Sequence, residues 1–371
     1  MKIAIDARMY LESGIGRYIR NLIKELERLD SENEYFILLK KKDFDTLTFK
    51  KNFKKILADF GWYGIKEQIK LPKLLNFLKV DLVHFPHFNV PLFYQGKFVV
   101  TIHDLIHQHY QMRRATMHDP LTYKIKQLGY RTIFKNAVSK SSKILTPSNY
   151  VKDLLVKEWR VAEKKIIVTP EAVDDKIINL GQGSRVKGQE VLQKFNIKTP
   201  FIFYVGNAHP HKNVEGLIKA FLKLEQTYKN LTLVLSGSDH YFWQRIKKEY
   251  KQKNIIYTGF ITDEELVALY KNAKAFVMPS FEEGFGIPLL EAMACSCPVV
   301  SSDVGSLKEV GGDAALYFDP INIGDMVEKI QQVLNKENVR VELIKKGRER
   351  VKQFSWERLA KQTLEVYSKC V

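Results

Sequence analysis

The sequence predicts an α/β protein built from two doubly wound, Rossmann-like parallel sheets. Short apolar runs alternate with longer amphipathic stretches along the whole chain, which is typical of a parallel sheet with helices on both faces. The 371 residues, of which 45% are hydrophobic, suffice for two domains that each bury a core. No tandem repeat or low-complexity segment interrupts this pattern.

The expected strands form two sets, one in each half of the chain. In the first half they begin at Lys2, Tyr35, Leu82, Phe98, Ile144 and Ile166, and in the second half at Phe201, Thr232, Ile255, Ala275, Val299 and Ala315. Residues 174–199 separate the sets and show only the turn-like Gly181-Gln182-Gly183-Ser184 and a short helical stretch around Val191 and Leu192. We therefore place the domains at residues 1–180 and 181–354. A last amphipathic helix follows in residues 355–371, with Ser355 as its N-cap.

The net charge of +17 indicates attraction to a phosphate-bearing partner, which could be anionic lipid, nucleic acid or a polyprenyl-phosphate acceptor. Residues 113–143 hold eight bases against one acid, Asp119, so their charge is 8 − 1 = +7. The bases are Arg113, Arg114, Lys124, Lys126, Arg131, Lys135, Lys140 and Lys143. Apolar residues recur among them at roughly helical spacing, at Leu121, Ile125, Leu128, Ile133 and Phe134. This segment is either a basic amphipathic helix at a membrane surface or an ordinary surface helix with solvated lysines.

The longest apolar stretches have only the length of a strand, and residues 1–6 are typical of a first strand rather than of a signal peptide. We therefore expect a cytoplasmic protein, with peripheral binding at the inner face of the cell membrane left open. The three cysteines cannot all pair, and we expect Cys295 and Cys297 to be small buried residues, because no histidine or further cysteine pair stands near them to complete a metal site.

The most informative motif begins at Glu283 and crosses a predicted junction between a loop and a helix. Gly284 and Gly286 permit a sharp turn and the close approach of a ligand, and Pro288 suits the first turn of a helix. Backbone N–H groups at such a helix start favour a diphosphate. Glu283 in the loop and Glu291 in the helix can accept hydrogen bonds from hydroxyls. The alternative interpretation of these carboxylates is a solvated helix cap.

This motif resembles the signature of the retaining glycosyltransferases of family 4, which have the two-domain GT-B fold. Further motifs carry the resemblance in order along the chain: Asp6-Ala7-Arg8, Gly14-Ile15-Gly16-Arg17-Tyr18, Thr101-Ile102-His103-Asp104, Thr146-Pro147-Ser148, Tyr204-Val205-Gly206-Asn207, His211-Lys212-Asn213 and Thr258-Gly259-Phe260. The resemblance covers nearly the whole chain. It implies two domains that face a central cleft, with the acceptor on the first, the donor nucleotide on the second, and the last helix packed back on the first.

The resemblance also implies roles on the donor side. Glu283 would bind sugar hydroxyls and Glu291 the ribose. The remaining donor-binding residues would be Gly206, Asn207, Gly259, Phe260, Gly284, Phe285, Gly286 and Ile287. Of these, Gly259 and Phe260 would adjoin the nucleobase, unless they form a plain turn between a strand and a helix.

Lys212 is the expected cation at the leaving diphosphate, because a positive charge there compensates the charge that develops as the bond between sugar and phosphate breaks. The alternative is a solvated lysine at a helix start. Members of the family often carry an arginine after the glycine that ends the preceding strand and another directly before the lysine. Asn207 and His211 occupy these places here, so we expect His209 or His211 to substitute in part.

In the first half, Gly14 and Gly16 follow the first predicted strand. The resemblance implies that both belong to the donor-binding residues, with Gly16 near the donor diphosphate. A structural turn is the alternative, because Ile19 replaces the third glycine of a dinucleotide fingerprint. His103 and Asp104 close an apolar run, so they should emerge at the carboxyl end of a strand. The resemblance implies that His103 lies near the transferred sugar, and that Asp104 orients the imidazole or helps to place the acceptor. A structural histidine is the alternative.

Asp43-Phe44-Asp45 matches the metal-binding Asp-x-Asp pattern of the other large glycosyltransferase fold. It lies in a lysine-rich segment that we expect to be a surface loop, far in sequence from the sugar-binding motifs. Short motifs of this kind often match by chance. We therefore expect no metal ion and no other cofactor.

We expect a retaining glycosyltransferase that uses a nucleoside diphosphate sugar, with catalytic positions at His103, Asp104, Lys212 and Glu283. The chain looks most like bacterial mannosyltransferases of O-antigen and other surface polysaccharides, so GDP-mannose is the first expected donor, with UDP- and dTDP-sugars open. The acceptor would be a glycan or a polyprenyl-linked glycan. The alternatives are a sugar-nucleotide epimerase of the same architecture and a basic nucleic-acid-binding protein, although no recognised nucleic-acid module is present.

Overall fold

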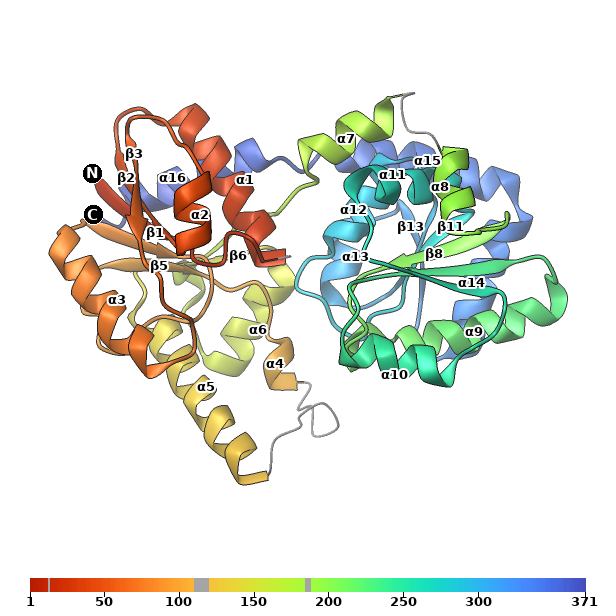
Figure 1. Ribbon diagram of the computed structural model, residues 1–371, viewed down its shortest axis with the longest axis horizontal. Coiled ribbons are helices and arrows are strands. Elements are labelled where there is room, and N and C mark those ends of the chain that lie inside the picture. Colours follow the sequence, from red (N-terminus) through yellow and green to blue (C-terminus); the bar gives the residue numbers. More distant parts are fainter. Residues whose placement is uncertain (13, 110–119, 184–187) are drawn as a thin grey trace. The chain divides into compact units, whose positions relative to one another are not determined.

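Figure 1 shows the computed structural model, which describes residues 1–12, 14–109, 120–183 and 188–371. The chain divides into two compact units. The first contains Met1–Leu105, Gln111–Glu171 and Ser355–Val371, and the second contains Ile106–Tyr110 and Ala172–Phe354. Each unit is built on one parallel sheet, so the predicted α/β class with two Rossmann-like domains is confirmed.

The sheet of the first unit has seven parallel strands in the order β3-β2-β1-β4-β5-β6-β7. Their bounds are β1 (Lys2–Asp6), β2 (Glu34–Leu39), β3 (Phe53–Leu57), β4 (Leu82–Phe85), β5 (Phe98–Thr101), β6 (Lys143–Thr146) and β7 (Ile166–Val168). The chain moves outward from β1 to β3 and then returns to β4 on the other side of β1. The strand order therefore reverses between β1 and β4, and ligands bind beyond the carboxyl ends of strands at such a point.

The sheet of the second unit has six parallel strands in the order β10-β9-β8-β11-β12-β13. Their bounds are β8 (Phe201–Val205), β9 (Thr232–Ser236), β10 (Ile255–Gly259), β11 (Ala275–Met278), β12 (Val299–Ser302) and β13 (Ala315–Phe318). Here the order reverses between β8 and β11. All six strands that the sequence predicts in this half begin at the expected residue.

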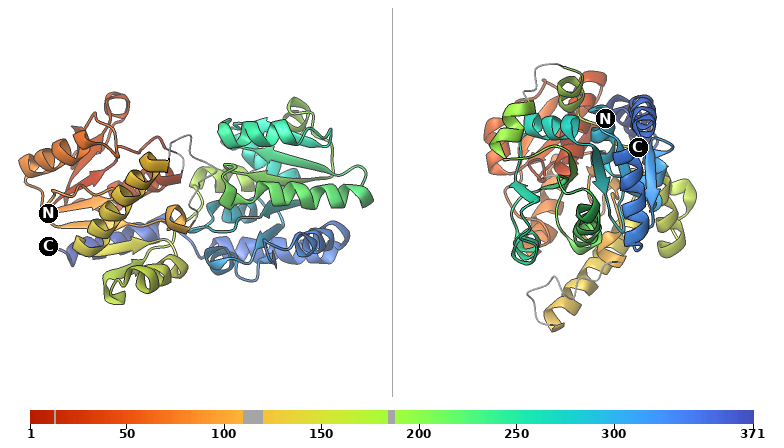
Figure 2. Two further views of the ribbon diagram at one scale, coloured as in Figure 1. Left: turned by 90° about the horizontal axis from the view of Figure 1, so that it is seen from below. Right: turned by 90° about the vertical axis from the view of Figure 1, so that its right-hand side faces the viewer.

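Helices cover both faces of each sheet (Figures 1 and 2). The helices placed with the first sheet are α1 (Gly14–Leu29), α2 (Lys41–Thr46), α3 (Ile65–Leu78), α5 (Pro120–Lys140), α6 (Asn149–Trp159) and α16 (Trp356–Ser368), with the short 3-10 turn η1 (Glu163–Lys165). Those placed with the second are α4 (Ile106–His109), α7 (Asp175–Gln182), α8 (Gly188–Lys194), α9 (Val214–Thr227), α10 (Tyr241–Glu249), α11 (Asp263–Asn272), α12 (Ile287–Ala294), α13 (Gly305–Gly311), α14 (Ile323–Asn335) and α15 (Glu337–Val351), with the 3-10 turn η2 (Pro210–Lys212).

The first sheet contains one strand, β3, that the sequence did not predict. Lys54 and Lys55 interrupt its apolar pattern, which edge strands tolerate because one side of the strand is not paired. Lys55 Nζ donates hydrogen bonds to the backbone oxygens of Phe44 and Leu47, at 2.6 and 2.7 Å, near the end of α2. The expected surface loop at Asp43-Phe44-Asp45 is therefore wrong: the motif is helical, and Asp43 is buried.

The division between the units falls at Glu171, not at residue 180, because α7 belongs to the second unit. Ile177 of α7 is fully buried in the hydrophobic core of that unit. No helical pattern in residues 174–182 was strong enough to assign this segment to a helix from the sequence. Cys295 and Cys297 are buried and unpaired in the same core, as expected.

The last helix, α16, packs against α1 of the first unit, and Ser355 caps its first turn by accepting from the Arg358 N–H. Near its end, the Tyr367 hydroxyl lies 2.6 Å from Nδ1 of His84 on β4, and His84 Nε2 lies 2.8 Å from the Thr101 hydroxyl of β5. All three side chains are fully buried, so the carboxyl-terminal helix completes the core of the first unit.

The patch predicted in residues 113–143 is described only in part, because residues 113–119 lie outside the described residues. Helix α5 confirms the predicted helix from residue 120 onward. On it, Phe134 is fully buried, whereas Leu128 is 69% exposed. Among the helices of the described residues, none is long and apolar enough to cross a bilayer.

Candidate active site

In the second unit, the residues predicted to bind a donor gather where the strand order reverses between β8 and β11. Tyr204 fixes the loop after β8, because its buried hydroxyl donates to the Asn207 oxygen at 2.6 Å. Gly206 between them has a φ of 153°, and a Cβ there would lie 2.8 Å from the Tyr204 hydroxyl. A glycine is therefore required at this position for the loop to close over the tyrosine.

Asn213 connects this loop to the segment that follows β11. Its backbone is left-handed, with a φ of 53°, and its amide nitrogen donates to the backbone oxygens of Pro279 and Pro320, both at 3.0 Å. The Phe281 N–H also donates to the His211 oxygen at 2.7 Å. These bonds hold Lys212, in the 3-10 turn η2, beside the loop that carries Glu283.

Lys212 and Glu283 form a buried ion pair. Lys212 Nζ donates to both carboxylate oxygens of Glu283, at 2.7 and 2.8 Å. Ser280 donates to the same carboxylate at 2.6 Å, and the Ser306 hydroxyl donates to the Glu283 backbone oxygen. Only 17% of the Lys212 side chain and 8% of the Glu283 side chain are exposed, so Lys212 is not a solvated lysine. The sequence predicted both residues at a donor but not their pairing.

The glycines after Glu283 shape the start of α12. Gly286 precedes the helix with a φ of 101°, and a Cβ there would lie 2.4 Å from Leu307 Cδ2. Pro288 lies in the first turn, as predicted. Phe285 is buried, and its ring packs edge-on against Phe354 with the ring centres 5.7 Å apart. Phe285 thus contributes packing, while the backbone around it forms the turn into the helix.

Glu291 on α12 is 2% exposed, so the interpretation as a solvated helix cap is wrong for this carboxylate. The Tyr270 hydroxyl lies 3.3 Å from Glu291 Oε2. Tyr270 is itself fully buried on α11, and sequence reasoning did not identify it. A buried carboxylate that accepts from a hydroxyl is suited to bind further hydroxyls.

The remaining donor-side residues are Gly259, the last residue of β10, and Phe260, which follows it. Gly259 has a φ of 74°, and its oxygen accepts from the Gly237 N–H at 3.0 Å. A Cβ on Gly259 would meet no atom within 4 Å, so the positive φ and not crowding favours glycine. Phe260 is 76% exposed, which leaves its ring available for contact with a planar ligand.

Two acidic residues that the sequence analysis did not identify lie within hydrogen-bonding distance of histidines. In the second unit, His109 Nδ1 lies 2.7 Å from Oε1 of the buried Glu282. In the first unit, His103 Nδ1 lies 2.9 Å from Glu171 Oε1, and its Nε2 lies 3.0 Å from the Pro86 oxygen. Glu171 could have been identified from the sequence, because it lies three residues after Val168, the end of β7, where side chains gather at the carboxyl edge of the sheet.

The Glu171 carboxylate and the Pro86 carbonyl oxygen both accept hydrogen bonds, so each requires a proton on the His103 nitrogen that faces it. The imidazole ring of His103 therefore carries two protons in this arrangement. Burial lowers the pKa of His103, but the hydrogen bond and charge of Glu171 outweigh it, and the pKa is raised above its ordinary value. Glu171 therefore orients the imidazole, while the role predicted for Asp104, whose charge also raises the pKa of His103, stays a prediction. Tyr18 packs edge-on against the same ring, with centres 4.8 Å apart.

Gly14 and Gly16 lie in the first turn of α1 and not in a turn before it. A Cβ on Gly16 would lie 2.6 Å from the Tyr10 oxygen and 2.8 Å from the Met9 oxygen, so close backbone packing requires this glycine. Gly14 has no such neighbour. Within the described residues, no group of three or more His, Cys, Asp or Glu is placed to hold a metal ion.

Comparison with known proteins agrees with this arrangement. The family model of Glycosyltransferase Family 4 matches residues 13–176, and that of Glycosyl transferases group 1 matches residues 189–350. The chain is 36% identical over 230 residues to O-antigen chain mannosyltransferase B of Escherichia coli, and the match spans 60% of each protein. It is 30% identical over 267 residues to O-antigen chain mannosyltransferase RfbU of Salmonella typhimurium, spanning 71% of this chain and 68% of that protein.

The chain spans only 35% of another relative, the serotype-specific mannosyltransferase WbdA of Escherichia coli, at 27% identity. Among solved structures, Anabaena HepE in complex with UDP-glucose has a TM-score of 0.78 at 16% identity, with all of both chains covered. A glycosyltransferase from Rickettsia africae has a TM-score of 0.75 at 19% identity, covering 100% of this chain and 98% of that one. The sequence matches and the shared fold show that the chain belongs to the family 4 glycosyltransferases.

Proposed function

We propose that the protein transfers a sugar from a nucleoside diphosphate donor to a glycan or polyprenyl-linked acceptor, with retention of anomeric configuration. The observation that carries this proposal is the buried pair of Lys212 and Glu283 at the point where the second sheet reverses, directly before α12. A fixed cation and a fixed carboxylate at such a point suit a ligand with an anionic part and a hydroxyl-bearing part.

In the proposed reaction, Lys212 and the first N–H groups of α12 face the diphosphate. They stabilise the charge that builds on the leaving phosphate oxygen as the bond to the sugar breaks. Glu283 holds Lys212 in position and accepts from the sugar hydroxyls. The leaving oxygen takes the acceptor proton on the same face of the sugar, which gives retention without a protein nucleophile. No divalent metal is required in this scheme.

GDP-mannose is the first donor we propose. The named activity of the two O-antigen relatives, which are mannosyltransferases, supports mannose. A thermal-shift screen of GDP-, UDP-, ADP- and dTDP-sugars tests the donor, because a ligand that binds only the folded state raises its apparent stability. Transfer to an acceptor, followed by NMR assignment of the new anomeric centre, tests retention. A product with inverted configuration would refute the scheme.

Two other functions predict different results in the same assays. A sugar-nucleotide epimerase would change the donor sugar without any acceptor. A nucleic-acid-binding protein would show salt-dependent binding to DNA or RNA and no nucleotide-specific thermal shift. The match of both halves of the chain to glycosyltransferase family models supports transfer over these two alternatives.

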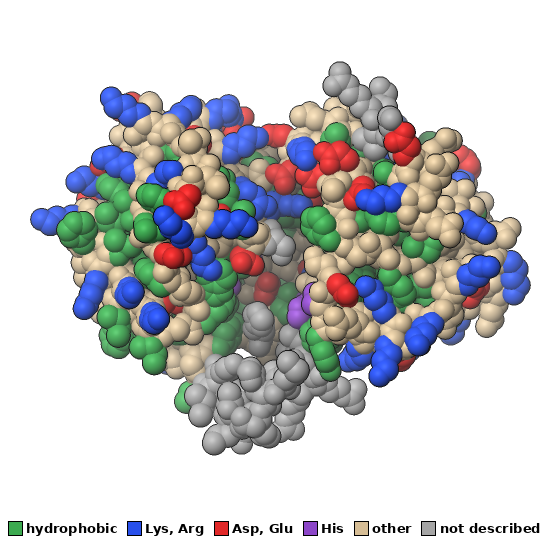
Figure 3. All heavy atoms as spheres, viewed as in Figure 1, with side chains coloured by type: hydrophobic (Ala, Val, Ile, Leu, Met, Phe, Trp, Pro, Cys, Tyr) green, Lys and Arg blue, Asp and Glu red, His purple; other side chains and the backbone are tan. Residues whose placement is uncertain are grey.

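We also propose that the first unit binds an anionic membrane surface through the exposed face of α3. Three large apolar side chains on this helix are exposed to solvent: Ile65 (80%), Ile69 (48%) and Phe77 (81%). Lys66, Lys70 and Lys73 lie on the same exposed face, and the one acid of α3, Glu67, is buried. Figure 3 shows apolar and basic side chains interleaved over this part of the unit. Such a face matches the apolar and anionic layers of a bilayer surface.

A further inference from the structure

A network of buried hydrogen bonds joins four elements of the first unit. The Tyr367 hydroxyl on α16 lies 2.6 Å from His84 Nδ1 on β4, and His84 Nε2 lies 2.8 Å from the Thr101 hydroxyl at the end of β5. The Thr101 hydroxyl also lies 3.0 Å from the hydroxyl of Tyr18 on α1. Each of the four residues is at most 1% exposed. We refer to these four residues as the tyrosine network.

The tyrosine network ends at a candidate catalytic residue. The Tyr18 ring packs edge-on against the His103 imidazole, with ring centres 4.8 Å apart and an angle of 81° between the ring planes. Glu171 and the Pro86 oxygen hold the two nitrogens of the same imidazole. These two hydrogen bonds fix the nitrogens, and the contact with Tyr18 restrains the tilt of the ring about the line between them.

His84 couples the two halves of the network. Burial and the charge of His103 lower the pKa of His84 to about 3, so its imidazole is neutral. A neutral imidazole donates from one nitrogen and accepts at the other. The bond between Nδ1 and Tyr367 therefore decides whether Nε2 donates to Thr101 or accepts from it. A change at the Tyr367 hydroxyl is thereby transmitted to Thr101 and to the hydroxyl of Tyr18.

Helix α16 contacts the network at both ends. Tyr367 supplies one terminal hydroxyl, and the Trp356 ring packs edge-on against Tyr18, with ring centres 6.4 Å apart. Apolar side chains could dock this helix without removing four polar groups from water, which is unfavourable unless each group finds a partner. A polar network adds directional bonds, which fix orientations that apolar packing leaves free. It is therefore suited to transmit the position of α16 to Tyr18.

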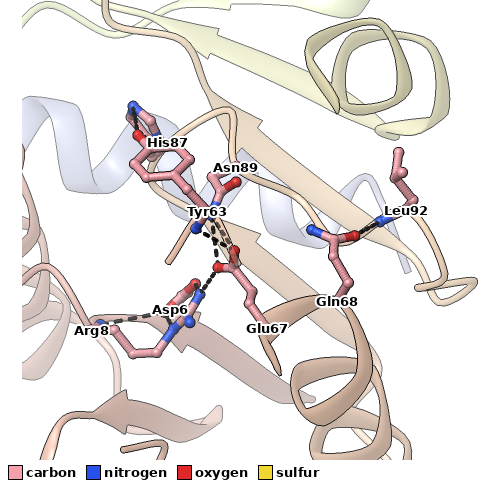
Figure 4. Close-up of polar contacts among 8 residues, drawn as sticks. All are labelled: Asp6, Arg8, Tyr63, Glu67, Gln68, His87, Asn89 and Leu92. Carbon is pink, nitrogen blue, oxygen red and sulfur yellow. Dashed lines mark hydrogen bonds and ion pairs between the residues drawn. The ribbon is translucent and has the colours of Figure 1, made fainter. Parts of the chain in front are cut away.

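A second buried network in the first unit lacks such an end point (Figure 4). Glu67 on α3 accepts from Arg8 at 2.6 Å and from the Asn89 amide nitrogen at 2.7 Å, and Arg8 also pairs with Asp6. These bonds tie α3 to the end of β1 and to the segment after β4. Among the described residues, none of the hydrogen bonds of this second network involves His103. Contact with a candidate catalytic residue thus distinguishes the tyrosine network.

We propose that Tyr18 is a positioning residue for His103, and that the tyrosine network lets the last helix set the tilt of this imidazole. The inference rests on the proposed transfer, in which His103 lies near the transferred sugar. The network residues touch no substrate in this scheme and act through His103. Helix α16 then takes part in catalysis, beyond completing the core of the first unit.

Two substitutions of Thr101 separate hydrogen bonding from packing. Thr101→Val keeps the branched shape that suits a strand but cannot bridge Tyr18 and His84, whereas Thr101→Ser keeps the hydroxyl and loses a methyl group. We expect Thr101→Ser to retain most of kcat, and Thr101→Val to lower kcat about tenfold to a hundredfold with little change in the donor KM, as for a misplaced catalytic group. A role in packing alone predicts the reverse order.

Tyr367→Phe tests the far end of the network, from which a change reaches His103 only through the other members. NMR titration of the His103 ring measures its pKa, which the hydrogen bond and charge of Glu171 raise. Thr101→Val and Tyr367→Phe should both lower this pKa toward the ordinary value of 6.5, because a tilted ring bonds less well to Glu171.

Tyr35→Phe is the matched control. It removes another buried tyrosine hydroxyl of the first unit, which donates to Asp30 at 2.6 Å and is not a member of the tyrosine network. This variant should lose stability but keep both kcat and the pKa of His103. An equal fall of that pKa in the control would show that any lost hydroxyl disturbs the site, and would overturn the assignment.

Two further results would overturn it. One is a kcat for Thr101→Val equal to or above that of Thr101→Ser. The other is an unchanged pKa of His103 in both Thr101→Val and Tyr367→Phe, which would show that the network only docks the helix. Tyr367→Phe decides the question if Thr101→Val does not fold. The titration needs no turnover, so absence of transfer would refute the proposed function while the positioning of His103 is still tested.

Discussion

Lys212 Nζ lies 2.7 and 2.8 Å from the two carboxylate oxygens of Glu283, so the cation proposed for the diphosphate and the acid proposed for the sugar form one buried unit. The charge of Lys212 is therefore already compensated when no donor is bound. A diphosphate that binds there competes with Glu283 for the ammonium group, and substitution of either residue affects the other.

Lys212→Ala should lower both stability and donor use. The unpaired Glu283 carboxylate is 8% exposed, and removing the partner of a buried charge destabilises a protein by about 3 kcal/mol or more. Loss of the cation at the diphosphate should raise the barrier to transfer by roughly 2 to 4 kcal/mol. Urea unfolding and kcat/KM for the donor measure the two effects. Lys219→Ala, an exposed lysine on α9, is the control, and an unchanged Lys212→Ala variant would contradict both roles.

Glu283→Gln and Glu291→Gln should separate the two carboxylates. Glu283→Gln should nearly abolish transfer but leave nucleoside diphosphate binding intact or stronger, because Lys212 loses its competing partner. Glu291→Gln should instead weaken binding of nucleotide and sugar nucleotide alike, as expected for a ribose contact. Calorimetric titration with the free nucleotide measures this difference, with the exposed Glu328→Gln as the control. Equal loss of nucleotide binding in both variants would show that the division of roles is wrong.

The pair of His103 and Glu171 predicts a dependence of stability on pH. The folded pKa of His103 is raised above its ordinary value of 6.5, so the folded state binds this proton more tightly than the unfolded state. The resulting stabilisation is complete below about pH 6.5 and is lost as the pH rises through the folded pKa.

Glu171→Gln should reduce this loss of stability as the pH rises above about 6.5, because it removes the charge that raises the pKa of His103. Thermal unfolding across that range measures the effect. Glu163→Gln is the control, since Glu163 pairs with Lys152 on the surface and its side chain is 72% exposed. Parallel pH profiles for the wild type and Glu171→Gln would refute the coupling.

Transfer should persist in excess EDTA, because the proposed scheme places Lys212 and the start of α12, and no divalent ion, at the diphosphate. The measurement is the initial rate with and without chelator. Loss of turnover that magnesium or manganese restores would contradict metal independence. It would also make Asp43-Phe44-Asp45 a candidate metal-binding site again, although Asp43 is buried in α2, with 4% of the residue exposed.

Replacement of Ile65, Ile69 and Phe77 by serine should release the protein from anionic vesicles, because these side chains form the apolar part of the proposed membrane face. Binding of the wild type should weaken as salt screens the lysines over about 8 to 10 Å. Sedimentation with vesicles of anionic and of neutral lipid measures both effects. The control is Ile321→Ser, an apolar residue of the second unit that is 81% exposed. Equal binding to anionic and neutral vesicles would contradict the proposal that the exposed face of α3 binds an anionic membrane.

The positions of the strands were predictable because buried parallel strands are nearly continuous apolar runs. All strands of the second sheet and six of the first follow that rule, whereas β3 does not: Lys54 and Lys55 interrupt its apolar pattern at an edge of the sheet. The prediction of a surface loop at Asp43-Phe44-Asp45 was wrong for a related reason. Its conformation depends on Lys55, eight or more residues away in sequence, which caps α2 through backbone oxygens.

The sequence by itself determined the fold class, the family and the local chemistry of the glycine-rich turn, because these depend on apolar periodicity and on residues close together in the chain. Only the tertiary structure decided which polar side chains pair with one another. Glu283 meets Lys212, His103 meets Glu171, and Arg8 meets Glu67 across separations of 71, 68 and 59 residues. No local pattern encodes such pairs. They arise because parallel strands bring their carboxyl ends to one edge of a sheet, and in the case of Glu67 because α3 packs beside the end of β1. Polar groups buried there away from water must find partners.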